Sequence, residues 1–200
     1  MFEVEFDTVK RRVSEQLRGL PSSLAYHSLD HTLDVLEQCE RIADAEGLTD
    51  KRLRFLLRLA ALYHDTGYLQ QYSQHEEASC RIFLSDTAHL NLSEEEKNDV
   101  LHLIMATKIP QQPATLAEKI ICDADLDYLG REDFIPTGDK LRREFLHYGM
   151  VDNDTEWDKR QLQFLSSHRY HTASSRKLRE PVKQKNISYC RRGFRKGRKV

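Results

Sequence analysis

The chain has 200 residues with 31 Lys/Arg and 32 Asp/Glu, a length that fits one domain whose core needs no disulfide bridges. Its four cysteines are widely spaced and form no CxxC pair, which favours a reducing compartment over secretion. No apolar run follows a basic N-terminal start, and the most apolar stretch, Phe55 to Tyr63, is too short to cross a bilayer. We therefore expect a soluble, cytoplasmic protein that makes no membrane contact.

Apolar residues recur at helical spacing through most of the chain, and no segment shows the alternation typical of strands. Two helix starts carry a capping box, in which Ser93 is followed by Glu96 and Thr115 by Glu118. Nothing divides the first 175 residues, so we expect one all-α domain over residues 1–175. The predicted helical segments lie around residues 2–17, 33–43, 53–61, 78–83, 93–104, 115–128, 141–145 and 157–165.

Three of these helical segments carry residue types that bind metal ions. His31 stands near the start of one, and the pair His64-Asp65 ends another, where Gly67 supplies the conformational freedom to stop the helix. Asp125 lies mid-helix among apolar neighbours, where a carboxylate is costly unless it is paired or metal-bound. We take Asp125 as the ligand and Asp123 as the alternative. If these groups converge, they form a nitrogen and oxygen site for Mn, Fe, Co, Ni or Zn, and less well for Mg.

Three stretches resemble the HD superfamily of metal-dependent phosphohydrolases. They are Tyr26-His-Ser-Leu-Asp-His31, Ala60-Ala-Leu-Tyr-His64-Asp65-Thr-Gly67 and Cys122-Asp-Ala-Asp125-Leu-Asp-Tyr-Leu-Gly130. The resemblance covers roughly residues 20–135 and includes the helix that starts at His75. It implies an HD-type helical bundle with a divalent cation between core helices, held by His31, His64, Asp65 and Asp125. It also implies hydrolysis of a phosphoester of a small molecule, with nucleotides and signalling nucleotides among the candidates.

Further residues are candidates for catalysis. Asp65 is expected to double as a proton acceptor through a metal-activated water. His75 and Glu76 either line the site or begin a helix whose dipole Glu76 complements. Lys108 either contacts a phosphate or is a solvated surface lysine. Thr107 stands where a histidine often stands in two-metal HD proteins, so we favour one metal and keep a two-iron oxygenase as an alternative.

The charge is distributed unevenly along the chain. Residues 176–200 hold 11 bases and one acid, so the first 175 residues carry the other 20 bases and 31 acids. We expect this basic C-terminal tail to be solvated and poorly ordered. The alternative is that it binds nucleic acid or an acidic partner, in which case the protein is a non-catalytic regulatory or binding module.

Overall fold

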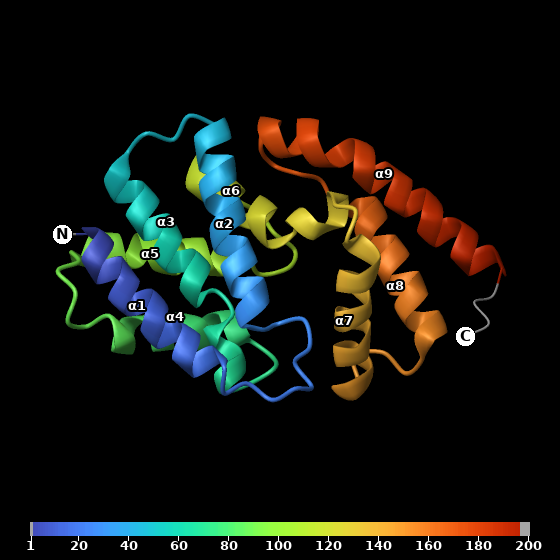
Figure 1. Ribbon diagram of the computed structural model, residues 1–200, viewed down its shortest axis with the longest axis horizontal. Coiled ribbons are helices and arrows are strands. Elements are labelled where there is room, and N and C mark those ends of the chain that lie inside the picture. The colour runs from blue at the N-terminus through green and yellow to red at the C-terminus, as the bar shows by residue number, and fades with distance from the viewer. Residues whose placement is uncertain (1, 197–200) are drawn as a thin grey trace.

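The computed structural model describes residues 2–196, and within this range it contains helices and no strand, which confirms the predicted all-α class (Figure 1). None of these helices is both long and apolar enough to span a lipid bilayer. The elements, with η marking 3-10 segments, are α1 (Phe2–Leu17), α2 (Leu29–Ala45), α3 (Lys51–Tyr63), η1 (Thr66–Leu69), α4 (His75–Asp86), α5 (Glu94–Ala106), α6 (Leu116–Asp125), η2 (Asp127–Gly130), α7 (Phe134–His147), α8 (Asp154–Ser167) and α9 (Ala173–Lys196).

The first six helices enclose the larger hydrophobic core, with α3 at its centre in contact with α1, α2, α5 and α6. Every residue of α3 from Phe55 to Tyr63 except Arg58 is buried, which explains why this segment is the most apolar stretch of the chain. Both predicted capping boxes form: the Ser93 hydroxyl accepts a hydrogen bond from the Glu96 N–H, and the Thr115 hydroxyl accepts one from the Glu118 N–H.

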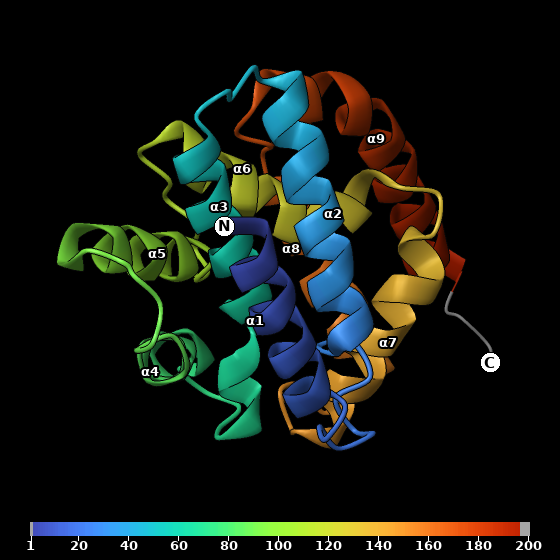
Figure 2. The ribbon, with the colours of Figure 1, turned by 60° about the vertical axis from the view of Figure 1, so that its left-hand side comes forward.

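A second, smaller core joins η2 to α7, α8 and α9. It contains Leu129, Phe134, Leu165 and Ile187, all of which are buried. In Figures 1 and 2, α2 lies between the helices around α3 and the last helix, α9. The segment from α6 through η2 passes from the first core to the second, and the functional residues gather at this junction.

The expectation of a poorly ordered basic tail is wrong for the residues that the structure describes. Helix α9 begins at Ala173, so the predicted boundary near Ser175 falls inside one continuous helix, while residues 197–200 lie outside the described range. The inner face of α9 buries Ser175, Lys183 and Ile187 against α8 and η2. Gly130 is in such close contact that an added Cβ would lie 2.5 Å from the Arg179 backbone oxygen. Ion pairs and these contacts order a segment whose composition alone favours solvation.

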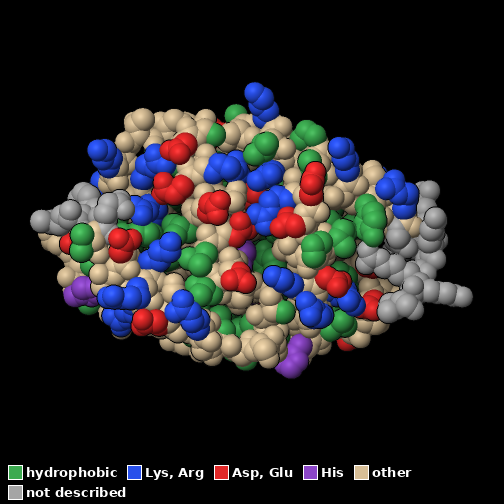
Figure 3. Space-filling model, viewed as in Figure 1, with side chains coloured by type: hydrophobic (Ala, Val, Ile, Leu, Met, Phe, Trp, Pro, Cys, Tyr) green, Lys and Arg blue, Asp and Glu red, His purple; other side chains and the backbone are tan. Residues whose placement is uncertain are grey.

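On the face shown in Figure 3, basic and acidic side chains are interspersed, and neither forms a large patch of one charge. An interspersed surface gives little of the long-range attraction that a polyanion needs. The nucleic-acid alternative therefore finds no support on this face.

Candidate metal centre

The His64-Asp65 pair lies where α3 ends, and both side chains are buried. The Nδ1 of His64 donates a hydrogen bond to the backbone oxygen of Ala61, 2.9 Å away. Since a carbonyl oxygen can only accept, this bond places the ring proton on Nδ1 and leaves a lone pair on Nε2. The hydrogen bond therefore prepares His64 to bind a cation through Nε2.

Gly67 follows the pair for a reason other than the one we expected. The helix has already ended at Tyr63, and Gly67 lies in η1 beneath the first residue of α4. An added Cβ on Gly67 would stand 1.9 Å from the backbone oxygen of His75. Ser79 ties the same turn together, because its hydroxyl donates to the His64 backbone oxygen and accepts from the Gly67 N–H. Glycine is needed here because α4 leaves no room for a Cβ, more than because the backbone needs a glycine's conformational freedom.

Four predicted ligands from α2, the α3 end and α6 come together. The Nε2 of His31 lies 3.4 Å from the Nε2 of His64, 3.3 Å from an Asp65 oxygen and 3.2 Å from an Asp125 oxygen. The Nε2 of His64 lies 3.2 Å from that Asp65 oxygen and 3.8 Å from that Asp125 oxygen. Ligands that each stand about 2.1 Å from one cation are about 3.0–3.5 Å from their neighbours and up to about 4.2 Å from a ligand on the opposite side, so these separations fit a single ion.

The buried polar atoms of the site also fit a cation. The Oδ2 of Asp65, the oxygen that faces both imidazoles, is buried and accepts no hydrogen bond among the described residues. A buried carboxylate oxygen without a partner is costly, and a bound cation would satisfy it. His31, His64 and Asp65 each offer a ligand atom, and these atoms all lie within 4.8 Å of one another. Asp125 adds a fourth ligand atom, a carboxylate oxygen, next to His31.

The carboxylates of Asp65 and Asp125 favour a positive charge between them. Burial alone would lower the pKa of His31, but Asp125 and Asp65 outweigh it and raise that pKa to about 10. Burial alone would raise the pKa of Asp65, but the charge of His64 and the close polar contacts with His31, His64 and His75 hold it well below its usual range. A proton on His31 balances the two acids, and a divalent cation would replace it.

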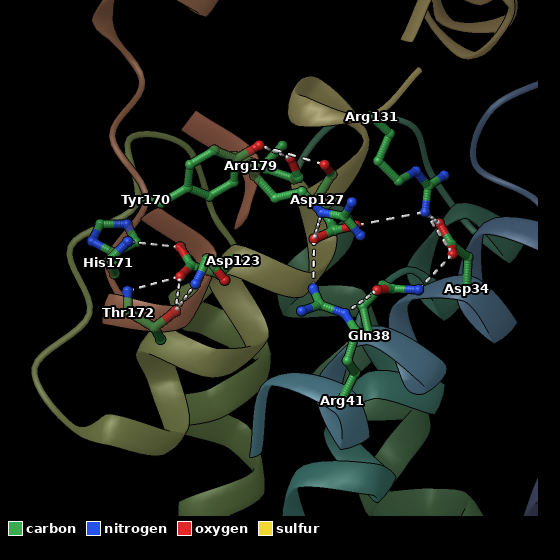
Figure 4. A network of polar contacts seen from close by, with 12 residues as sticks. Asp34, Gln38, Arg41, Asp123, Asp127, Arg131, Tyr170, His171, Thr172 and Arg179 are labelled. Carbon is green, nitrogen blue, oxygen red and sulfur yellow. Dashed lines mark hydrogen bonds and ion pairs between the residues drawn. The ribbon is translucent and has the colours of Figure 1, made fainter. Parts of the chain in front are cut away.

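Asp125 is the last residue of α6, not a mid-helix residue, and its two acidic neighbours face other parts of the molecule. Asp123 is fully buried and accepts hydrogen bonds from the backbone N–H groups of His171 and Thr172 and from the Thr172 hydroxyl (Figure 4). These bonds fasten the segment before α9 and use both oxygens of Asp123. Asp123 therefore anchors the chain, and Asp125 is the aspartate that faces the histidines.

Asp127 forms a second network that the sequence did not predict. Its buried carboxylate pairs with Arg41 of α2 and Arg179 of α9, each at 2.8 Å, and with Arg131 at 3.7 Å (Figure 4). Arg131 in turn forms two hydrogen bonds with Asp34 of α2, each of 2.8 Å. The network joins α2, η2 and α9 just beyond Asp125, so it fixes the position of that residue.

His75 and Glu76 begin α4 beside the site. The Nε2 of His75 lies 3.4 Å from the Oδ1 of Asp65 and 3.6 Å from a Glu76 oxygen. The ring of Tyr68 lies against both His75 and His27, with centroids 4.1 and 4.2 Å away, and the two histidine rings are 6.1 Å from each other. His75 is therefore held against the one oxygen of Asp65 that faces away from His31 and His64.

Thr107 and Lys108 line a cavity next to Asp65 and His75, and each has a hydrogen-bond or ion-pair partner nearby. The Thr107 hydroxyl donates to the Ile104 backbone oxygen, and the side chain is buried. Lys108 forms an ion pair with Glu77 of α4, and its side chain is 43% exposed. Lys108 therefore lines the cavity with its charge already paired to that of Glu77.

Glu144 of α7 is a buried residue that sequence reasoning missed. It accepts hydrogen bonds from the backbone N–H groups of Tyr26 and His27 and from the Tyr72 hydroxyl, and it pairs with the Nδ1 of His27. Burial alone would raise the pKa of Glu144, but His27 and these N–H donors lower it. Glu144 thereby fixes the segment that leads into His31, although it lies 118 residues after Tyr26 in the sequence.

Two cavities meet the site. One of about 410 Å³ is lined by Asp65, His75 and Asp125 at one end and by side chains of α7 and α8 at the other. The second, of about 180 Å³, is lined by His31 and Asp125 together with Asp30 and Asp34 of α2. Small-molecule sites are typically cavities of about 300–1,000 Å³, so the larger one has the size of a substrate pocket.

Comparison with known proteins places this centre in a family. The family model of the HD domain matches residues 28–127, which is half of the chain and includes His31, His64, Asp65 and Asp125. No curated protein and no solved structure matches the chain significantly. HD domains bind divalent metals, and His31, His64 and Asp65 form a group that could hold one. The matched span and the histidine-aspartate centre it encloses together show that the chain belongs to the HD domain family.

Proposed function

We propose that this chain is a metal-dependent phosphohydrolase that cleaves a phosphoester of a small molecule. The observation that carries the proposal is the convergence of His31, His64, Asp65 and Asp125 around the unsatisfied Oδ2 of Asp65, at one end of a cavity of substrate size. The membership of the HD domain family supports it, because the superfamily is one of metal-dependent phosphohydrolases.

The four convergent side chains would hold the divalent cation, through the Nε2 atoms of His31 and His64 and the carboxylates of Asp65 and Asp125. When bound, the cation supplies an acidified water and polarises a phosphoryl oxygen. Asp65 faces it with Oδ2, which leaves Oδ1 directed at His75. In this arrangement Asp65 would hold the cation and accept the proton of the attacking water, with the His75 ring 3.4 Å from its Oδ1.

His75 is suited to act as the general acid. Burial alone would lower its pKa, but Asp65 and Glu76 outweigh the burial and raise the pKa above its ordinary value. A raised pKa favours the protonated ring, which could give its proton to the leaving alkoxide oxygen. Glu76, 3.6 Å from the ring, adds to this shift, while Lys108 at the wall would attract the phosphate.

Metal content and turnover measured together test the proposal. We expect purified protein to contain a bound divalent cation and to release phosphate from small phosphoesters in a screen with Mn²⁺, Co²⁺, Ni²⁺, Zn²⁺ and Mg²⁺. Asp65→Asn should lose both metal and turnover, whereas His75→Gln should keep the metal and lose turnover. Metal-free protein that hydrolyses nothing in any of these ions would overturn the proposal.

A further inference from the structure

The larger cavity has an aromatic end that the metal centre does not use. Its far wall is built from α7 and α8, where Leu141, Phe145, Trp157 and Phe164 line the space. These residues lie outside residues 28–127, the span that matches the HD domain. They are therefore a feature of this chain's C-terminal helices and not part of the matched family region.

The cavity is larger than a phosphate group requires. Its volume of about 410 Å³ equals that of about fourteen water molecules at roughly 30 Å³ each, whereas a phosphate has five heavy atoms. A phosphoryl group at Asp65 and Asp125 therefore leaves space for the group esterified to it. That group extends toward Phe145 and Trp157.

The chemistry of the far wall selects a flat, uncharged group. Phe145 and Trp157 meet edge to face, with ring centroids 5.4 Å apart, and both residues line this end of the cavity. No acidic side chain stands among the described α7 and α8 residues that line this end. A cationic group is further disfavoured because the Arg160 guanidinium already covers the Phe145 ring, 5.2 Å from its centroid.

Arg160 is held in place at this end of the cavity. Its Nη1 donates a hydrogen bond of 2.9 Å to the Met150 backbone oxygen. The amide of Gln161 accepts a weak hydrogen bond from the Cys190 thiol, which ties α8 to α9. Arg160 and Gln161 are therefore held in place by hydrogen bonds to other parts of the chain, so this end of the cavity is ordered before a ligand binds.

We propose that the α7–α8 end of this cavity is a subsite for a planar aromatic group on the substrate. The inference rests on the proposed function, since it assigns the alcohol part of the phosphoester whose phosphate faces the metal centre. The substrate is then a phosphomonoester of an aromatic alcohol or a nucleoside, and α7 and α8 select it against alkyl and cationic phosphates.

Trp157 gives a direct measurement of this subsite, because it is the only tryptophan of the chain. We would titrate the purified full-length protein, with Mn²⁺ present, with phenylphosphonate, methylphosphonate, phosphocholine and adenosine monophosphate, and follow tryptophan fluorescence. Phenylphosphonate should change the emission and bind about tenfold or more tightly than methylphosphonate, as expected from one or two aromatic stacking contacts. A response to adenosine monophosphate would identify a nucleobase as the natural ring, and its absence a simpler aryl group.

Two variants separate ring recognition from folding. Phe145→Leu keeps an apolar side chain in the wall but removes the ring, so it should weaken phenylphosphonate about fivefold and leave methylphosphonate unchanged. Leu146→Ala, at the next position of α7 and outside the cavity lining, is the control that perturbs the same helix without touching the subsite. Equal affinity for phenylphosphonate and methylphosphonate, or tighter binding of phosphocholine, would overturn the inference.

The two proposals fail in different ways. A protein that binds phenylphosphonate selectively at Trp157 but hydrolyses no phosphoester supports the aromatic subsite and refutes the hydrolase. A protein that hydrolyses phenyl and methyl phosphate with the same kcat/KM, and whose fluorescence does not respond, is a hydrolase without the subsite.

Discussion

The backbone oxygen of His75 occupies the position next to Gly67 where a side chain would begin, 1.9 Å from an ideal Cβ. This contact brings α4, which carries His75 and Glu76, directly against the turn that carries His64 and Asp65. The His64-Asp65 turn and His75 are therefore positioned by one close approach between two pieces of backbone.

Gly67→Ala should consequently disrupt the centre. The added Cβ collides with backbone that cannot move without shifting α4, so we expect the free energy of unfolding to fall by about 3 kcal/mol or more. Metal content should fall with it. Gly47→Ala is the matched control: Gly47 has a φ of +71° but nothing within 4 Å of its Cβ, so alanine there costs about 1–2 kcal/mol in backbone strain. Normal metal content in Gly67→Ala, measured by elemental analysis, would contradict this explanation.

The two aspartates of the Asp123-Ala-Asp125 sequence should separate stability from metal binding. Asp123→Asn places an amide among three hydrogen-bond donors from His171 and Thr172, and should cost about 1.5–3 kcal/mol of stability with metal content retained. Asp125→Asn should leave the metal-free protein about as stable but weaken metal affinity at least tenfold.

Chemical denaturation and metal titration of both variants check this assignment. Each variant is the control for the other, because they lie two residues apart on the same helix. The assignment is wrong if Asp123→Asn loses the metal while Asp125→Asn keeps it.

Arg179→Ala should show that the basic C-terminal helix belongs to the folded protein. The change removes one of the partners of buried Asp127 and one of the links between α9 and η2, so we expect a loss of about 3 kcal/mol in the free energy of unfolding. Lys185→Ala, at an exposed position of the same helix, should change stability by less than about 0.5 kcal/mol. Urea denaturation compares the two, and equal effects would mean that α9 is held by something other than this ion pair.

The parts of the fold that sequence reasoning captured are encoded locally. The apolar spacing of α3 and the capping boxes at Ser93 and Thr115 depend on residues within a few positions of one another, so the helices could be located without coordinates. His64 and Asp65 are adjacent, and their position at a helix end before a glycine was readable for the same reason.

The parts that it missed depend on residues far apart in the chain. The order of α9 rests on Asp127 and Gly130, about 50 residues before their partner Arg179, so composition alone indicated a solvated tail. The choice between Asp123 and Asp125 was decided by which of them faces α2, which periodicity within α6 leaves open. Glu144 reaches Tyr26 from another helix, and no local pattern distinguishes it from a surface glutamate.

The stability of the folded protein should fall on acidification because of His168. Burial, and then the nearby charge of Lys183, lower the pKa of His168 to about 3. Lys183 is itself fully buried and donates a hydrogen bond of 2.8 Å to the His168 backbone oxygen. The folded state thus holds a neutral imidazole next to a buried ammonium group.

The sign follows from proton uptake. Between about pH 6.5 and pH 3 the unfolded chain binds a proton at His168 and the folded chain does not, so acidification favours unfolding. From pH 6.5 to pH 5 this amounts to about 2 kcal/mol, at about 1.4 kcal/mol per pH unit. His168→Gln removes the titrating group, so its free energy of unfolding should depend less steeply on pH than that of the wild type. Urea denaturation of both proteins in a metal chelator gives the difference, in which the other titrating groups cancel, and parallel pH profiles would rule out His168 as the source.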